Sequence, residues 1–144
     1  MIEQDTIRLL RECDAGVKMG VSAIEEVVEK IHSEEFRNVL VESRRKHDAL
    51  DRELQQELDR YQDEGKDPDP VARGMSWMKT NAMLMMKPSD RTIADLMTDG
   101  CNMGVKSLSK YLNEYEAADE RSKDIAKKLV SLEEKLAVDI REYL

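Results

Sequence analysis

Apolar residues recur at alternating steps of three and four along four long stretches of this chain, the spacing that places them on one face of an α-helix. The first stretch carries Ile7, Leu10, Asp14, Val17, Val21, Ile24, Val28 and Ile31. The second carries Phe36, Leu40, Ser43, His47, Leu50, Leu54, Leu58 and Tyr61. The third carries Ile93, Leu96, Gly100, Gly104, Leu108, Leu112 and Tyr115, and the fourth carries Ile125, Leu129, Leu132, Leu136, Ile140 and Leu144. The pattern predicts an all-α bundle of four amphipathic helices.

The connections between these stretches differ in length. Only a few residues separate the first stretch from the second and the third from the fourth, so each pair is predicted to form an antiparallel hairpin. The middle connection is much longer and has an apolar stripe of its own, which predicts a crossover with a short helix. We therefore expect one domain over residues 1–144, with hairpin 1 at 2–63, the crossover at 64–88 and hairpin 2 at 89–144.

A short glycine-containing segment occurs twice, once in each predicted hairpin. Residues 16–21 read GVKMGV and residues 100–105 read GCNMGV, a shift of 84 residues (100 minus 16) that suggests a duplicated hairpin. Glycines four apart lie on one face of a helix and allow a second helix to approach closely. We therefore predict that Gly16, Gly20, Gly100 and Gly104 form a structural helix contact.

Composition and charge exclude several classes of function. The 23 basic and 31 acidic residues give a formal charge of −8, which disfavours nucleic acid and anionic membrane surfaces as partners. No apolar run is long enough for a membrane span, and no signal peptide is evident. We expect a cytoplasmic protein whose two cysteines, Cys13 and Cys101, remain free thiols.

Two hairpins joined by a long crossover resemble the ferritin-like four-helix-bundle superfamily over essentially the whole chain, and in particular its small bacterial branches without an established activity. The resemblance implies helices ordered up, down, down, up, so that the first and third lie antiparallel. In that arrangement Gly16 would face Gly104 and Gly20 would face Gly100. In the metal-binding members, two helices each supply an inward Glu and the other two each supply a Glu-x-x-His motif.

This chain departs from that ligand set. Arg44, not Glu, stands three residues before His47, and Glu133 is followed three residues later by Leu136. A catalytic residue or a cofactor is therefore not predicted. The metal alternative, iron or manganese on an incomplete and unorthodox ligand set, has as its candidates His47, Asp14, Asp99 and Glu133. The competing interpretation makes His47 a seam residue held by Asp51 or Ser43, one turn away on its own helix.

Methionines are concentrated in the crossover beside the only tryptophan. Thioethers bind copper(I), but a packing stripe whose surplus apolar face meets another protein fits this chain better. The predicted interaction surface comprises Met75, Trp77, Met78 and Met86.

Two hypotheses for function follow. The first is a non-enzymatic ferritin-like bundle that acts through protein association, as a homodimer or with a protein partner. The alternative is a metal-binding ferritin-like oxidase or ferroxidase.

Overall fold

The computed structural model describes residues 2–68 and 89–144. Its long helices are α1 (Ile2–Val27), α2 (Glu34–Arg60), α4 (Asp90–Glu114) and α5 (Glu120–Asp139), with short 3₁₀ turns η1 (Val28–Lys30) and η2 (Arg141–Tyr143). No strand occurs among the described residues. The prediction of an all-α protein with four long helices is therefore confirmed. The predicted crossover helix lies outside the described residues.

Three of the long helices begin at a side chain that accepts a hydrogen bond from a backbone N–H group in the first turn. Such caps satisfy donors that have no partner within the helix. Ser33 caps α2, Ser89 caps α4 and Asp119 caps α5. Ser89 follows Pro88 in the sequence, so the beginning of α4 is encoded locally.

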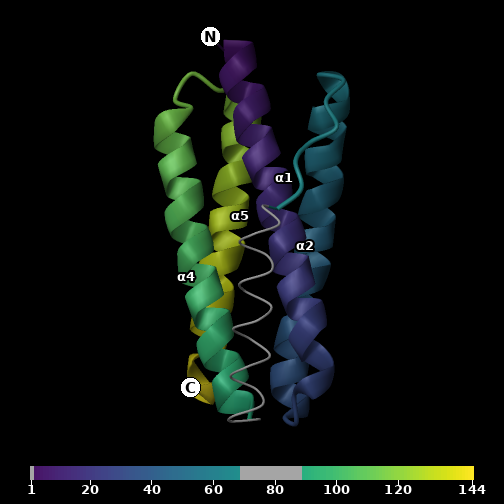
Figure 1. The fold of residues 1–144 in the computed structure, drawn as a ribbon, viewed down its shortest axis with the longest axis vertical. Coiled ribbons are helices and arrows are strands. Elements are labelled where there is room, and N and C mark those ends of the chain that lie inside the picture. The colour runs from purple at the N-terminus through teal and green to yellow at the C-terminus, as the bar shows by residue number, and fades with distance from the viewer. Residues whose placement is uncertain (1, 69–88) are drawn as a thin grey trace.

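The helices run in two directions (Figure 1). The chain descends in α1, returns in α2, rises again in α4 and descends in α5. Side-chain hydrogen bonds connect the two hairpins at both ends of the bundle. At one end Asp5 accepts a hydrogen bond from the Ala117 backbone N–H at 3.1 Å. At the other end the Asp90 carboxylate accepts hydrogen bonds from the backbone N–H groups of His32 and Ser33, both at 2.8 Å. The two hairpins therefore contact each other at both ends of the bundle.

The apolar core consists of two clusters stacked along the bundle. The first cluster is formed by Leu9, Leu10, Cys13, Val17, Leu50, Leu54, Leu58, Leu108, Ala118, Ile125, Ala126 and Leu129. The second is formed by Ile24, Val27, Ile31, Phe36, Leu40, Ile93, Ala94, Met97, Cys101, Leu136 and Ile140. On every helix the sequence between the two clusters contributes a residue that is not apolar. These residues are Gly20, His47, Gly104 and Glu133, which we call the polar layer.

The predicted glycine-to-glycine contact is wrong. A Cβ atom added at Gly16 would lie 3.4 Å from Leu129 of α5, and one added at Gly100 would meet no described atom within 4 Å. The prediction fails because a different face of α4 points inward at Gly100. Met97 and Cys101 are buried there, whereas Gly100 is exposed, so between residues 96 and 101 the inward stripe runs one position later than the sequence pattern predicts. At Ile93, Gly104 and Leu108 the predicted and observed stripes coincide.

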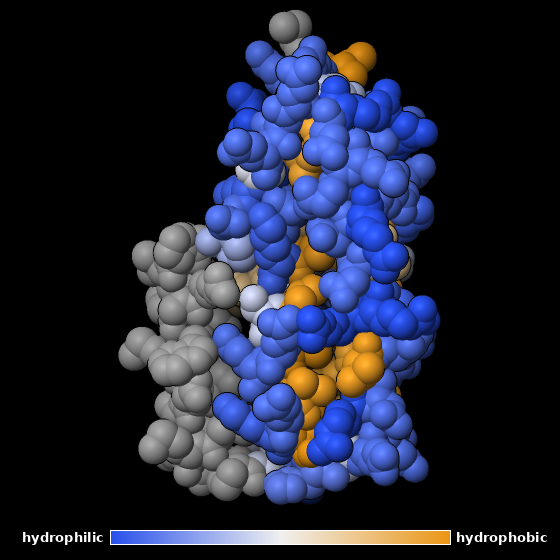
Figure 2. Space-filling view, turned by 90° about the vertical axis from the view of Figure 1, so that its right-hand side faces the viewer, coloured by the Kyte–Doolittle hydropathy of each residue, from blue (hydrophilic) through white to orange (hydrophobic). Residues whose placement is uncertain are grey.

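The outer surface is predominantly polar. Figure 2 shows a face covered by hydrophilic residues, with a narrow hydrophobic band along its length. Among the residues that the structure describes, the exposed large hydrophobic ones are Ile2, Val41, Met103, Val138 and Leu144. In the described part of the chain, no helix combines the length and apolar character needed to cross a lipid bilayer.

Candidate functional site

The polar layer contains a buried pair of ionisable side chains. His47 comes from α2 and is 0% exposed, and Glu133 comes from α5 and is 9% exposed. His47 Nε2 lies 3.0 Å from Glu133 Oε1, and His47 Nδ1 lies 2.8 Å from the Ser43 carbonyl oxygen one turn earlier. The Ser43 carbonyl oxygen can only accept a hydrogen bond, so His47 Nδ1 carries a proton and donates it. Nε2 shares the second hydrogen bond with the Glu133 carboxyl group, and a carboxylate there pairs with an imidazolium at His47.

The surroundings of His47 favour this charged form. Burial lowers the pKa of His47, but the hydrogen bond and the negative charge of Glu133 raise it by more, with smaller contributions from the Ser43 carbonyl and Asp48. The net pKa lies above the ordinary value of 6.5. The charge of Glu133 therefore favours the protonated form of His47, and the pair connects α2 to α5 within the core.

Small residues on the other two helices make room for this pair. A Cβ atom at Gly20 of α1 would lie 3.1 Å from His47 Nε2 and 3.5 Å from Glu133 Oε1. One at Gly104 of α4 would lie 3.6 Å from Glu133 Cδ. Gly20 and Gly104 are equivalent in the repeated segment, since 104 minus 20 is again 84. Their role is to accommodate large polar side chains from α2 and α5.

A thiol adjoins the pair but is not activated by it. Burial raises the pKa of Cys101 far above its ordinary value, and the negative charge of Glu133 and a hydrogen bond to its carboxyl group raise it further. Burial likewise raises the pKa of Cys13 to about 12. Both residues are free and buried, in line with the sequence prediction of free thiols. A neutral, enclosed thiol is a poor nucleophile, because the thiolate is the reactive form.

The structure brings together two of the four candidate metal ligands. His47 and Glu133 meet, but Asp14 lies six positions before Gly20 on α1, which is roughly 9 Å along a helix axis. Asp99 is exposed on α4. Among the described residues, no group of three or more His, Cys, Asp or Glu side chains is arranged to hold a metal ion. Of the two partners expected for His47 on its own helix, Ser43 contributes, through its carbonyl oxygen, and the main partner is Glu133.

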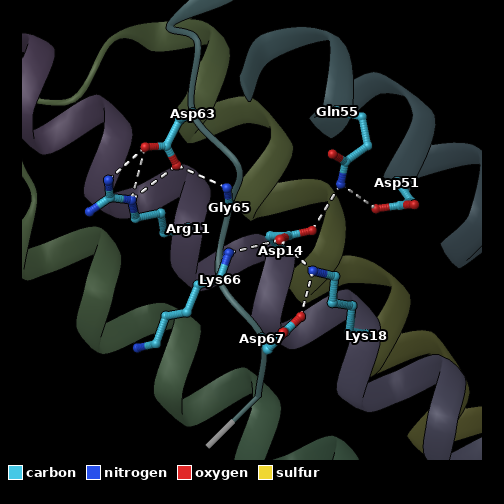
Figure 3. Close-up of polar contacts among 9 residues, drawn as sticks. All are labelled: Arg11, Asp14, Lys18, Asp51, Gln55, Asp63, Gly65, Lys66 and Asp67. Atoms are coloured by element: carbon cyan, nitrogen blue, oxygen red, sulfur yellow. Dashed lines mark hydrogen bonds and ion pairs between the residues drawn. The ribbon is translucent and has the colours of Figure 1, made fainter. Parts of the chain in front are cut away.

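Asp14 forms a second buried polar site, where the chain that follows α2 returns along α1 (Figure 3). It is 0% exposed. Oδ1 accepts a hydrogen bond from Gln55 Nε2 at 2.9 Å, and Oδ2 accepts one from the Lys66 backbone N–H at 2.9 Å. Lys18 Nζ lies 2.9 Å from the same carboxylate and 3.0 Å from Asp67 Oδ1. Asp14 therefore anchors residues 62–68, which we call the strap.

A turn within the strap brings it to Asp14. Asp63 accepts a hydrogen bond from the Gly65 backbone N–H at 3.0 Å, the Asx turn typical of Asp-x-Gly sequences. Gly65 has a φ of 83°, and a Cβ there would collide with Asp14. Arg11 of α1 holds the Asp63 carboxylate with both Nε and Nη2 and keeps the pKa of Asp63 below its usual value.

Sequence reasoning identified Asp14 as a polar residue on an apolar face but missed its partners. Gln55 lies on another helix and Lys66 uses a backbone group, so no periodic pattern marks them. Lys18 is the i+4 neighbour of Asp14 on α1, and helical spacing could have identified it. The Asp63-x-Gly65 turn was the available signal. The proposed interaction surface of Met75, Trp77, Met78 and Met86 lies outside the described residues.

Comparisons with protein-family models, with curated proteins and with solved structures give no match to this chain.

Proposed function

We propose that this protein is a non-enzymatic four-helix bundle with a ferritin-like arrangement, which acts by associating with another protein chain, first of all a second copy of itself. One observation carries the proposal. The buried ionisable residues at the centre of the bundle are engaged with one another, His47 with Glu133 and the Ser43 carbonyl, at distances of 3.0 and 2.8 Å. A side chain that bridges two helices in this way positions those helices and has no lone pair directed at a substrate.

The helix directions support the ferritin-like part of the proposal. α1 and α5 run one way, α2 and α4 run the other, and the long connection joins the two hairpins. Metal-binding bundles of this topology place carboxylates and histidines from all four helices at the middle of the core. In this chain two of the four helices contribute glycine at that level, Gly20 and Gly104.

Association is supported by the surface of α4 and by the sequence of the crossover. Met103 is 69% exposed, one position before Gly104, and flexible thioether side chains adapt to partner surfaces. The methionine-rich crossover provides the interaction surface in this proposal. Two buried free thiols are compatible with a reducing, cytoplasmic setting, which is part of the proposal.

One observation favours the alternative, a metal-binding oxidase or ferroxidase. Glu133 contacts both His47 and Cys101, and the three residues come from three different helices, although they are not arranged to hold a metal ion as they stand. Imidazole, carboxylate and thiolate are all transition-metal ligands once they have lost their protons. A metal ion would have to displace the Nε2 proton of His47 and break its bond to Glu133.

Metal content and assembly distinguish the two functions. The full chain is purified without chelator, dialysed and subjected to elemental analysis, an iron(II) oxidation assay and light scattering coupled to size exclusion. The proposal predicts less than one iron, manganese or zinc atom per chain, iron(II) oxidation no faster than with a His47→Gln variant, and a mass above that of one chain. Two metal atoms per chain that are lost in His47→Gln, with oxidation lost as well, would establish the alternative. A strictly monomeric chain that captures no protein would contradict the association.

A further inference from the structure

The forces that hold the strap differ from those that hold the helices. Residues 62–67 are Gln, Asp, Glu, Gly, Lys and Asp, without a single apolar side chain. No strap residue belongs to either apolar core cluster. The strap is held by Arg11 on Asp63, by Glu12 on the Lys66 ammonium, and by Asp14 and Lys18. Its attachment to α1 therefore depends on ion pairs and hydrogen bonds. Pro68, which is buried, is the apolar residue at the end of the strap.

Two of these contacts involve one buried carboxylate, that of Asp14. Asp14 accepts the hydrogen bond from the Lys66 backbone N–H, and Lys18 connects Asp14 to Asp67. Gln55 holds the other oxygen of Asp14 from α2 and also donates to Asp51 at 3.2 Å. Asp14 is thus oriented by the helices whether or not the strap is in place. The docking site persists when the strap leaves it.

The strap also forms one wall of a cavity of about 310 Å³. The α1 wall of this cavity includes Val17 and Val21, and the α2 wall includes Asp48 and Asp51. Asp67 and Pro68 close it on the strap side. The cavity is already partly open to solvent, and Val21 is half-buried. Movement of residues 62–68 away from α1 would widen this opening and expose more of the apolar wall, while both core clusters keep all their members.

We propose that the strap is a latch, released by local opening at Asp14 without unfolding of the bundle, and that its release opens the cavity between α1 and α2. Segments with few apolar contacts and solvent-accessible polar ones open at a lower free energy than the core to which they are attached. The latch is independent of which partner the bundle binds. It makes access to the α1–α2 groove a property that ligands, salt or modification of the strap can control.

Amide hydrogen exchange measured by NMR on the full chain tests the latch. The reporter is the Lys66 amide, which donates to Asp14, and the reference is the amide of Leu129 in the core of α5. In the unmodified protein, Lys66 should exchange well before Leu129. Asp14→Asn should accelerate exchange at Lys66 roughly 10- to 100-fold, as expected for loss of a hydrogen bond to a charged group, and leave Leu129 unchanged.

Two further variants sharpen the test. Asp48→Asn makes the same change of charge on the opposite wall of the cavity, where no bond to the strap is made, and should leave Lys66 exchange unaltered. Gly65→Ala keeps every charge but places a Cβ against Asp14 at a positive φ. It should accelerate Lys66 exchange as Asp14→Asn does, and it decides the question if the Asn variant fails to fold.

Opening of the cavity is read separately by chemical labelling. The substitution Val21→Cys introduces a thiol into the apolar wall of the cavity. This thiol should react faster with a thiol reagent in the double variant with Asp14→Asn than in the double variant with Asp48→Asn. The native buried thiols serve as slowly reacting references. The latch is wrong if Lys66 and Leu129 exchange at the same rate in the unmodified protein. It is equally wrong if Asp14→Asn and Gly65→Ala both leave Lys66 exchange unchanged, or if labelling at position 21 does not respond.

Discussion

The substitution Gly20→Ala tests the polar layer by adding a single methyl group to it. The new Cβ would lie 3.1 Å from His47 Nε2 and 3.2 Å from His47 Cδ2, closer than carbon normally approaches these atoms. The imidazole ring would have to move by a few tenths of an ångström. It cannot do so freely, because the Ser43 carbonyl holds one ring nitrogen at 2.8 Å and Glu133 holds the other at 3.0 Å.

Two opposing terms set the magnitude. Alanine is favoured over glycine inside a helix by about 1 kcal/mol. Overpacking a tightly filled site costs about 1–3 kcal/mol. We therefore expect Gly20→Ala to be neutral or destabilising by up to about 2 kcal/mol. Gly104→Ala, whose Cβ would make ordinary contact with Glu133 at 3.6 Å, and Gly100→Ala, at an exposed position, should each stabilise the fold by about 0.5–1 kcal/mol.

Urea unfolding followed by helical circular dichroism gives the free energy of unfolding of all three variants under the same conditions. The expected order of stability places Gly104→Ala and Gly100→Ala above the unmodified protein and Gly20→Ala at or below it. If Gly20→Ala raised the free energy of unfolding as much as Gly100→Ala does, the reasoning would be refuted, because His47 could not then occupy the space beside Gly20.

Two further predictions follow from the pKa shifts. The pKa of His47 is raised by Glu133, so the contribution of the pair to stability is complete below the unfolded value of 6.5 and is lost as the pH rises through the higher folded value. Urea unfolding across this range should show that loss, and an equal pH dependence in Glu133→Gln would contradict it. The thiols of Cys13 and Cys101 should react with a disulfide reagent only on unfolding, because burial raises the pKa of both. Rapid labelling of the folded protein would show that one of them is accessible.

The sequence pattern predicted the helices well because each carries its own signal. Apolar spacing and the capping residues Ser33, Ser89 and Asp119 are local, and the structure places the helices where those signals stand. The inward face of α4 was predicted one position too early between residues 96 and 101. Gly100 and Cys101 are both compatible with a helix interface, and only packing against the other three helices selects Cys101 as the buried residue.

The candidate site was less predictable, because its bonds connect residues far apart in the chain. The sequence predicts His47 either as a seam residue held by Ser43 or Asp51 or as a metal ligand, and Glu133 only as a metal ligand. Periodicity does not reveal that these two polar residues, 86 positions apart, will meet each other. The role of Gly20 was misassigned for the same reason. A glycine on an inward face indicates that something large lies opposite, and the sequence does not say whether that is a helix backbone or an imidazole ring.

The protonation state of His47 tests the central claim, that the polar layer is an ion pair connecting α2 and α5. Long-range ¹H–¹⁵N correlation spectra of the imidazole rings can be recorded at neutral pH on the unmodified protein, with exposed His32 as internal reference. The account predicts that both ring nitrogens of His47 are protonated and that Glu133→Gln removes one of these protons. A His47 ring with one bare nitrogen in the unmodified protein, or with a nitrogen whose signal moves when a metal chelator is added, would contradict it.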